Sequence, residues 1–134
     1  MKIKGFLLIL FLLASGCATT TEIDPDANKS FVGSYTGQVY DGGSFTPVTT
    51  TFSLSTDGQL SGSYALQTQA GVEQGSLTNV QRESDYSLSM HWDDKYGNGL
   101  LRVLFSEDFN AFMGFWGGEN TPVAFPWGGE RETP

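Results

Sequence analysis

From residue 31 to the C-terminus, large apolar residues recur at every second position, and this pattern limits the fold more than any other feature of the chain. In the segment 86–92 large apolar residues alternate with Ser and His, and the segments 60–66 and 123–127 alternate in the same way. A period of two is typical of a β-strand with one buried face. After residue 30 no window keeps the apolar spacing of a helix for three turns, so the sequence predicts an all-β domain.

Turn-forming residues divide this domain at short intervals. Asp57-Gly58 lies between two alternating runs and is a strong signal for a hairpin. Each connection is short enough for a hairpin and too short for a crossover helix. Closing the sheet would remove both exposed edges, so we expect an eight-stranded antiparallel up-and-down barrel, with an open sandwich as the alternative. The eight expected strands are 31–40, 46–55, 59–68, 72–81, 85–92, 99–106, 109–117 and 123–131.

The N-terminus has the features of an export signal. Lys2 and Lys4 precede an unbroken apolar run of nine residues, 6–14, which covers only about 14 Å as a helix and is too short to span a bilayer. Small residues stand directly before Cys17, the only cysteine. This arrangement resembles the bacterial lipobox, although Ala14 stands where Leu is commonest. The alternative is an ordinary secreted protein cut after Gly16 or Ala18.

The lipobox resemblance implies a division of the chain into three parts. Residues 1–16 would be a signal peptide, and residues 17–30 would be a lipidated Cys17 followed by a flexible tether, because residues 18–30 hold a single bulky apolar side chain. Residues 31–134 would form the single barrel domain. The acyl chains on Cys17 would then make the membrane a partner. Ala18 is not the Asp of an inner-membrane retention signal, so in a bacterium with two membranes we expect the outer membrane, facing the periplasm.

Charge and cysteine content exclude several classes of function. The net charge of −8 argues against a nucleic-acid partner, whose phosphates need a basic surface. A single cysteine excludes an internal disulfide and a cysteine-based zinc cluster. We expect no cofactor.

Three short motifs resemble the avidin and calycin group of small barrels. Gly33-Ser-Tyr35 is similar to their opening Gly-x-Trp, and the segment 57–64 is similar to the second avidin hairpin. Arg131 stands where calycins place a basic residue that stacks on the opening aromatic, which implies a structural clasp between Arg131 and Tyr35. Biotin is not the expected ligand, because Leu66 replaces a hydroxyl partner and 123–131 contains no Asp.

No set of residues in the sequence has the composition and spacing of a known catalytic motif or metal-binding loop. His91 is the only histidine, and no Gly-x-Ser-x-Gly elbow accompanies it. The acidic turn 93–99 has Lys95 at a position where a calcium loop needs an acid. Adjacent acids on a strand point to opposite faces, so pairs such as 107–108 do not form a glycosidase couple. We therefore expect neither an enzyme nor a metal site.

The inward-facing aromatic residues are the one sequence feature that indicates a binding site. The interior of an eight-stranded barrel is just wide enough to be filled or to hold one small ligand. Our leading hypothesis is an envelope lipoprotein that binds a small apolar or aromatic molecule at the open end of its barrel. The rival is a protein-interaction module with a filled barrel, such as an inhibitor or an envelope-assembly accessory. Segment 112–117 is apolar on both faces, which requires a cover from the tether or an envelope protein. The candidate ligand-binding residues are Tyr35, Tyr64, Trp92, Trp116 and Trp127.

Overall fold

A computed structural model describes residues 16, 17 and 26–133 of the chain. The expected signal peptide and most of the expected tether, including residues 18–25, lie outside the described residues. Cys17 is exposed with a free thiol. The helix in the described part is a single 3-10 turn, η1 (Lys29–Phe31), and none of the described residues forms a helix long and apolar enough to cross a bilayer.

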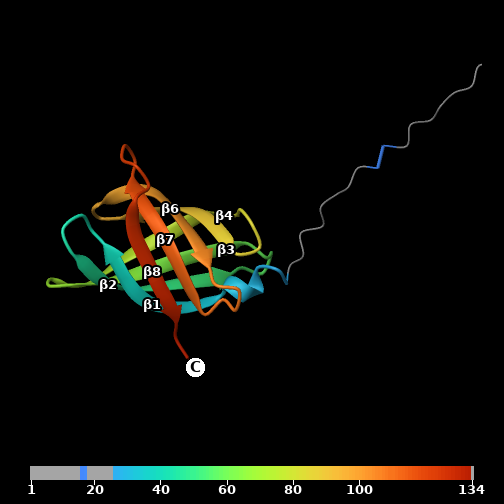
Figure 1. The fold of residues 1–134 in the computed structure, drawn as a ribbon, viewed down its shortest axis with the longest axis horizontal. Helices are drawn as coiled ribbons and strands as arrows, with labels where there is room; N and C mark the ends of the chain where they lie inside the picture. Colours follow the sequence, from blue (N-terminus) through green and yellow to red (C-terminus); the bar gives the residue numbers. More distant parts are fainter. Residues whose placement is uncertain (1–15, 18–25, 134) are drawn as a thin grey trace, which may run out of the picture.

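The domain is a closed antiparallel barrel in which each strand pairs with the next along the chain (Figure 1). The eighth strand closes the barrel on the first, in a register that runs from Tyr35 opposite Arg131 to Val39 opposite Trp127. This confirms the predicted eight-stranded up-and-down barrel. The strands are β1 (Gly33–Tyr40), β2 (Phe45–Leu54), β3 (Leu60–Thr68), β4 (Gly71–Arg82), β5 (Ser87–Asp94), β6 (Gly97–Phe105), β7 (Ala111–Gly118) and β8 (Phe125–Arg131).

One end of the barrel, which we call the closed end, is packed solid with aromatic rings. The Tyr35 ring meets the rings of Phe105 and Phe112 edge-on, with centroids 5.4 and 5.5 Å away. Phe31 from η1 is fully buried and packs against Phe105 and Phe109 at 5.0 and 5.1 Å. Such edge-to-face contacts are favourable beyond the area that they bury. The η1 turn therefore plugs this end.

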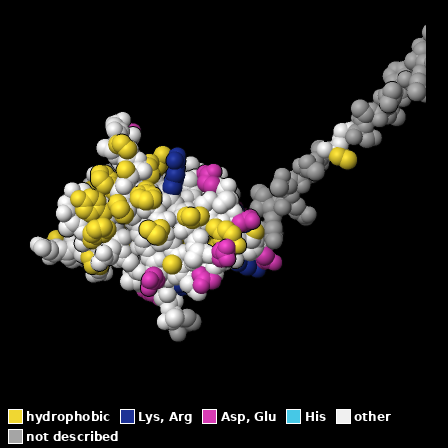
Figure 2. All heavy atoms as spheres, in the orientation of Figure 1, with side chains coloured by type: hydrophobic (Ala, Val, Ile, Leu, Met, Phe, Trp, Pro, Cys, Tyr) yellow, Lys and Arg dark blue, Asp and Glu magenta, His cyan; other side chains and the backbone are white. Residues whose placement is uncertain are grey.

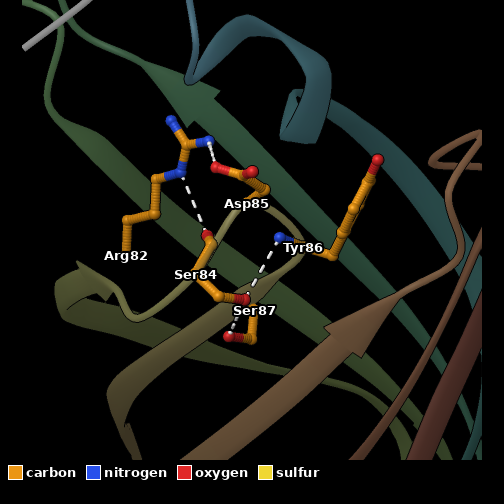
Figure 3. Close-up of polar contacts among 5 residues, drawn as sticks. All are labelled: Arg82, Ser84, Asp85, Tyr86 and Ser87. Atoms are coloured by element: carbon orange, nitrogen blue, oxygen red, sulfur yellow. Dashed lines mark hydrogen bonds and ion pairs between the residues drawn. The ribbon is translucent and has the colours of Figure 1, made fainter.

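The β4–β5 turn covers the same end (Figure 3). Arg82 donates from Nε to the Ser84 carbonyl and pairs through Nη2 with Asp85, while the Ser84 hydroxyl accepts from the Tyr86 amide. The Arg82 guanidinium lies 5.8 Å from the centre of the Phe31 ring. We expected strand 85–92 to place Tyr86 inward. It belongs instead to this turn, more than a third exposed, with its ring pointing away from Arg82.

Arg131, at the end of β8, joins three segments at the closed end. Its guanidinium lies 4.8 Å from the centre of the Tyr35 ring, and Nη2 donates to the Tyr35 hydroxyl at 2.6 Å. Further hydrogen bonds reach the carbonyls of Ser30, Val32 and Phe109. Arg131 thus ties the entry segment and the β6–β7 turn to the first and last strands.

Candidate functional site

The opposite end of the barrel, which we call the open end, contains a cavity of about 740 Å³ that opens to solvent. Its walls come from the β1–β2 turn, the β3–β4 hairpin and the inward faces of β5, β7 and β8. In Figure 1 this end lies on the left, away from η1. In Figure 2 hydrophobic side chains gather around the same end, where Phe45 and Tyr96 form an exposed apolar part of the rim. A volume of this size is typical of a small-molecule site.

Four aromatic side chains form the wall and floor of the cavity as two edge-to-face pairs. Tyr64 meets Trp127 with ring centroids 4.8 Å apart, and Trp92 meets Trp116 at 5.2 Å. Gly75 lies behind the Tyr64 ring, and a Cβ there would lie 2.0 Å from its Cζ atom. The absence of a side chain at Gly75 therefore lets Tyr64 lie flat against β4.

The polar atoms of the three indoles are already engaged within the protein. Trp92 donates to the Gly117 carbonyl at 3.0 Å, Trp116 to the Tyr40 carbonyl at 2.9 Å, and Trp127 to the Thr50 hydroxyl at 3.0 Å. Because these N–H groups have acceptors in the fold, none of them is free to orient a ligand. Trp92 and Trp127 are nearly buried, and Trp116 is the most exposed of the three indoles.

Asp94, the last residue of β5, places a carboxylate beside the aromatic wall. Its Oδ2 accepts from the Tyr64 hydroxyl at 2.8 Å, and its Oδ1 accepts from the Tyr96 amide at 2.8 Å. Burial, reinforced by this hydrogen bond and by the Asp94 charge, raises the pKa of Tyr64 far above its ordinary value. Tyr64 therefore stays protonated and holds the Asp94 carboxylate against the wall of the cavity.

Asp41 adds a second carboxylate, at the start of the β1–β2 turn. Its Oδ1 accepts from the amides of Ser44 and Gly43, at 2.8 and 3.0 Å, and its Oδ2 accepts from the Thr46 hydroxyl. The hydrogen bonds from the Ser44 and Gly43 amides lower the pKa of Asp41. Asp41 therefore shapes its turn and also adds negative charge to the rim.

Glu73 on β4 lies beside the mouth, opposite Leu66 of β3 in the strand register. Its Oε1 pairs with the Lys95 ammonium at 2.5 Å, and that contact lowers the pKa of Glu73. Its Oε2 is buried and has no hydrogen-bond partner among the residues that the structure describes. Lys95 is thus engaged by Glu73 and leaves the charges of Asp41 and Asp94 unneutralised.

Four of the five candidate ligand-binding residues come together in the cavity: Tyr64, Trp92, Trp116 and Trp127. Tyr35 does not join them. It lies fully buried at the closed end under Arg131. The β1–β8 register pairs Tyr35 with Arg131 at that end, whereas Val39, further along β1, pairs with Trp127 and lines the cavity. Alternation along the chain predicts which face a residue occupies, but not its depth along the barrel axis.

Neither His91 nor the acidic pair 107–108 lies in the cavity, whereas Asp94 of the acidic turn 93–99 does. His91 is exposed on the outer face of β5, and residues 107–108 belong to the turn at the closed end. In the described part of the chain no group of three His, Cys, Asp or Glu side chains is placed to hold a metal ion.

Asp94, Asp41 and Leu66 also line the cavity and were not among the predicted site residues. For Asp94 a signal was present, since Met90 and Trp92 point inward and the same period of two leads directly to it. Asp41 lies in a turn, where alternation carries no information.

The fold and the cavity together define a small closed β-barrel with one plugged end and one hollow, aromatic end. Comparison of the chain with protein-family models, curated proteins and solved structures finds no match. The resemblance to avidins and calycins stays a prediction.

Proposed function

We propose that this protein is a non-enzymatic binding protein of the bacterial envelope, which holds a small apolar or aromatic molecule at the open end of its barrel. The observation that carries the proposal is the 740 Å³ cavity walled by Tyr64, Trp92, Trp116 and Trp127. A structural role alone would favour filling this volume, as the rings at the closed end fill theirs. The open end is instead left accessible to solvent, with a volume large enough for a small molecule and a largely apolar lining, as is typical of ligand sites.

The proposal includes an anchor at Cys17, supported by the lipobox-like sequence before it. The chain enters the barrel at the closed end, where Asn28 donates to the Gly58 carbonyl and Phe31 is buried. A tether on this side would attach to the barrel at its closed end. A ligand would then reach the mouth of the cavity at the other end without displacing the tether.

Tryptophan fluorescence gives a direct test of binding, because all three tryptophans of the chain line the cavity. A panel of periplasmic metabolites and aromatic probes should include compounds that quench or shift this fluorescence with saturation. The variant Leu66→Lys, which places a long charged side chain in the cavity, should abolish the response. Its matched control, Leu104→Lys, makes the same change on the exposed outer face of β6 and should leave the response intact. Equal responses in the two variants would refute a ligand site in the cavity.

The anchor is tested separately by fractionation and mass spectrometry. The wild-type chain expressed in a bacterium with two membranes should appear in the membrane fraction, with a mass that includes acyl chains on Cys17. Cys17→Ser should move it to the soluble fraction. A mature protein that begins at another residue, or that carries no lipid, would refute the anchor and leave the cavity proposal standing.

The rival function, a protein-interaction module, has one observation in its favour. Leu104, Met113 and Phe115 lie on adjacent strands of the outer face and are 60%, 73% and 47% exposed. Exposed apolar groups that lie together are typical of interaction surfaces. Crosslinking in intact cells distinguishes the two functions, since Met113→Lys should abolish capture of a partner protein under the rival and leave ligand binding unchanged under the leading proposal.

A further inference from the structure

The residues around the open end indicate which charge a ligand must carry. Asp41 and Asp94 line the cavity, and no Lys, Arg or His is among the described residues that line it. Lys95, the cation near the mouth, is held by Glu73 and lies 5.1 Å from the centre of the Tyr96 ring. The potential inside the mouth is therefore negative.

Asp94 also has spare capacity to accept hydrogen bonds. An ionised carboxylate can accept roughly four, and Asp94 accepts one from the Tyr64 hydroxyl and one from the Tyr96 amide. A ligand that fills the cavity removes solvent from the remaining positions. A purely apolar or anionic ligand would remove water from these remaining positions and supply no donor in its place, which is unfavourable. A ligand with an N–H donor, above all a cationic one, would pair with it.

The aromatic wall favours the same ligand class. Because the indole N–H groups of Trp92, Trp116 and Trp127 already have acceptors, the aromatic lining offers no free indole donor to a ligand. Ring faces attract cations, most strongly where solvent is excluded. A carboxylate beside two aromatic pairs is thus complementary to a positive group on an apolar body.

We propose that the cavity selects organic cations, namely amines with an aromatic or apolar body, with the ammonium group at Asp94 and the body against Trp92, Trp116 and Trp127. This inference rests on the proposed binding function and adds the charge and orientation of the ligand. Tyr64 is a positioning residue here, because its hydroxyl fixes the Asp94 carboxylate at the cavity wall.

Three probes of similar shape and different charge test the inference by calorimetry on the full chain at pH 7. They are 1-naphthaleneethylamine, which is cationic, 1-naphthaleneethanol, which is neutral, and 1-naphthaleneacetate, which is anionic. We expect the amine to bind about tenfold more tightly than the alcohol, as one charge-assisted contact would produce, and the acetate to bind most weakly. Added salt should weaken binding of the amine and leave that of the alcohol unchanged.

Adjacent residues of β5 provide a matched pair of variants. Asp94→Asn keeps the shape and an acceptor for Tyr64 but removes the charge inside the cavity. Asp93→Asn removes the same charge one residue earlier, where the side chain is exposed and does not line the cavity. Asp94→Asn should weaken binding of the amine about tenfold and leave that of the alcohol unchanged. Asp93→Asn should change either affinity less than about twofold, since it is a screened surface charge.

The outcomes separate this inference from the function on which it rests. Equal affinities for the amine and the alcohol, or equal effects of Asp94→Asn and Asp93→Asn, would overturn cation selection while the cavity remained a binding site. Failure of all three probes to bind at millimolar concentration, together with no fluorescence response in the metabolite panel, would overturn both.

Discussion

The clasp at Arg131 is expected to make a large polar contribution to the stability of the barrel, because one guanidinium serves four acceptors and one ring. We consider Arg131→Met, which keeps an apolar stem against the Tyr35 ring and removes every donor. The Val32 carbonyl would lose its charged donor at 2.6 Å, and the Phe109 carbonyl would keep only the longer hydrogen bond from the Tyr35 hydroxyl at 3.3 Å. The contacts of Arg131 with the Tyr35 ring and hydroxyl would also be lost. An acceptor left unpaired costs about 1–3 kcal/mol, and a cation over a ring contributes roughly 0.5–2 kcal/mol.

We use the lower end of each range because the Arg131 guanidinium is only part-buried. The free energy of unfolding should then fall by about 3 kcal/mol. A domain of this size has about 5–15 kcal/mol in total, so the loss is a large fraction. The melting temperature should fall by on the order of 15 °C. Urea unfolding followed by tryptophan fluorescence and circular dichroism measures the change.

Arg102→Met is the matched control, because Arg102 is exposed on the outer face of β6 and the change in charge is the same. It should alter the free energy of unfolding by less than about 0.5 kcal/mol. Tyr35→Phe should cost less in the Arg131→Met background than in the wild type, because the hydroxyl that accepts from Arg131 is then already without that donor. Equal stabilities of the Arg131→Met and Arg102→Met proteins would refute the clasp.

Two further predictions concern Tyr64. Gly75→Ala should destabilise the barrel by about 1–3 kcal/mol in urea unfolding and weaken binding of the naphthaleneethylamine probe, because a Cβ would displace the Tyr64 ring from Asp94. The control Gly43→Ala, whose Cβ meets only the Asp41 Oδ1 at 3.7 Å, should change neither stability nor binding. Wild-type stability and binding in Gly75→Ala would contradict this geometry. In an alkaline titration at 295 nm, Tyr64 and Tyr35 should ionise only on unfolding, because burial raises the pKa of each. The folded protein then keeps protons that the unfolded chain releases near pH 10, so the free energy of unfolding should fall as the pH rises above about 10. The fall should be less steep in Tyr64→Phe, which lacks one of these protons. Ionisation of Tyr64 and Tyr35 at the same pH as the exposed tyrosines would refute this prediction.

The architecture could be predicted from the sequence because each strand has one face toward the core and one toward solvent. Turn residues such as Asp57-Gly58 then marked the ends of the strands to within a few residues. The prediction was wrong at Tyr86, which belongs to a turn and not to the strand that begins at Ser87. The Tyr86 ring continues the apolar alternation, yet the amide bonds to the Ser84 hydroxyl within a turn and the ring packs 5.4 Å from Phe109. An aromatic residue at a strand end satisfies the pattern whether it belongs to the sheet or to a cap.

The division into a plugged end and a hollow end could not be predicted, because it depends on the tilt and stagger of the strands. Tyr35 and Tyr64 look alike in the sequence, each two residues after a glycine and each inward. The closing register places Tyr35 beside Arg131, whereas the β3–β4 register places Tyr64 opposite Gly75 near the mouth. Which tyrosine serves the clasp and which serves the cavity follows from pairing between strands far apart in the chain.

The carboxylates at the mouth are the strongest reason to treat the open end as a site rather than as an incompletely filled core. An inward position on a small barrel normally stabilises the fold through an apolar side chain, as Leu88 and Met90 do earlier on β5. Asp94 continues that inward series and accepts a hydrogen bond from the hydroxyl of the buried Tyr64. Asp94→Leu alone would leave the buried Tyr64 hydroxyl without its acceptor, at a cost of about 1–3 kcal/mol. The double variant Tyr64→Phe/Asp94→Leu removes both partners and should be about as stable as the wild type in urea unfolding. We expect it to abolish binding of the amine, and retention of amine binding in this variant would refute a site at Asp94.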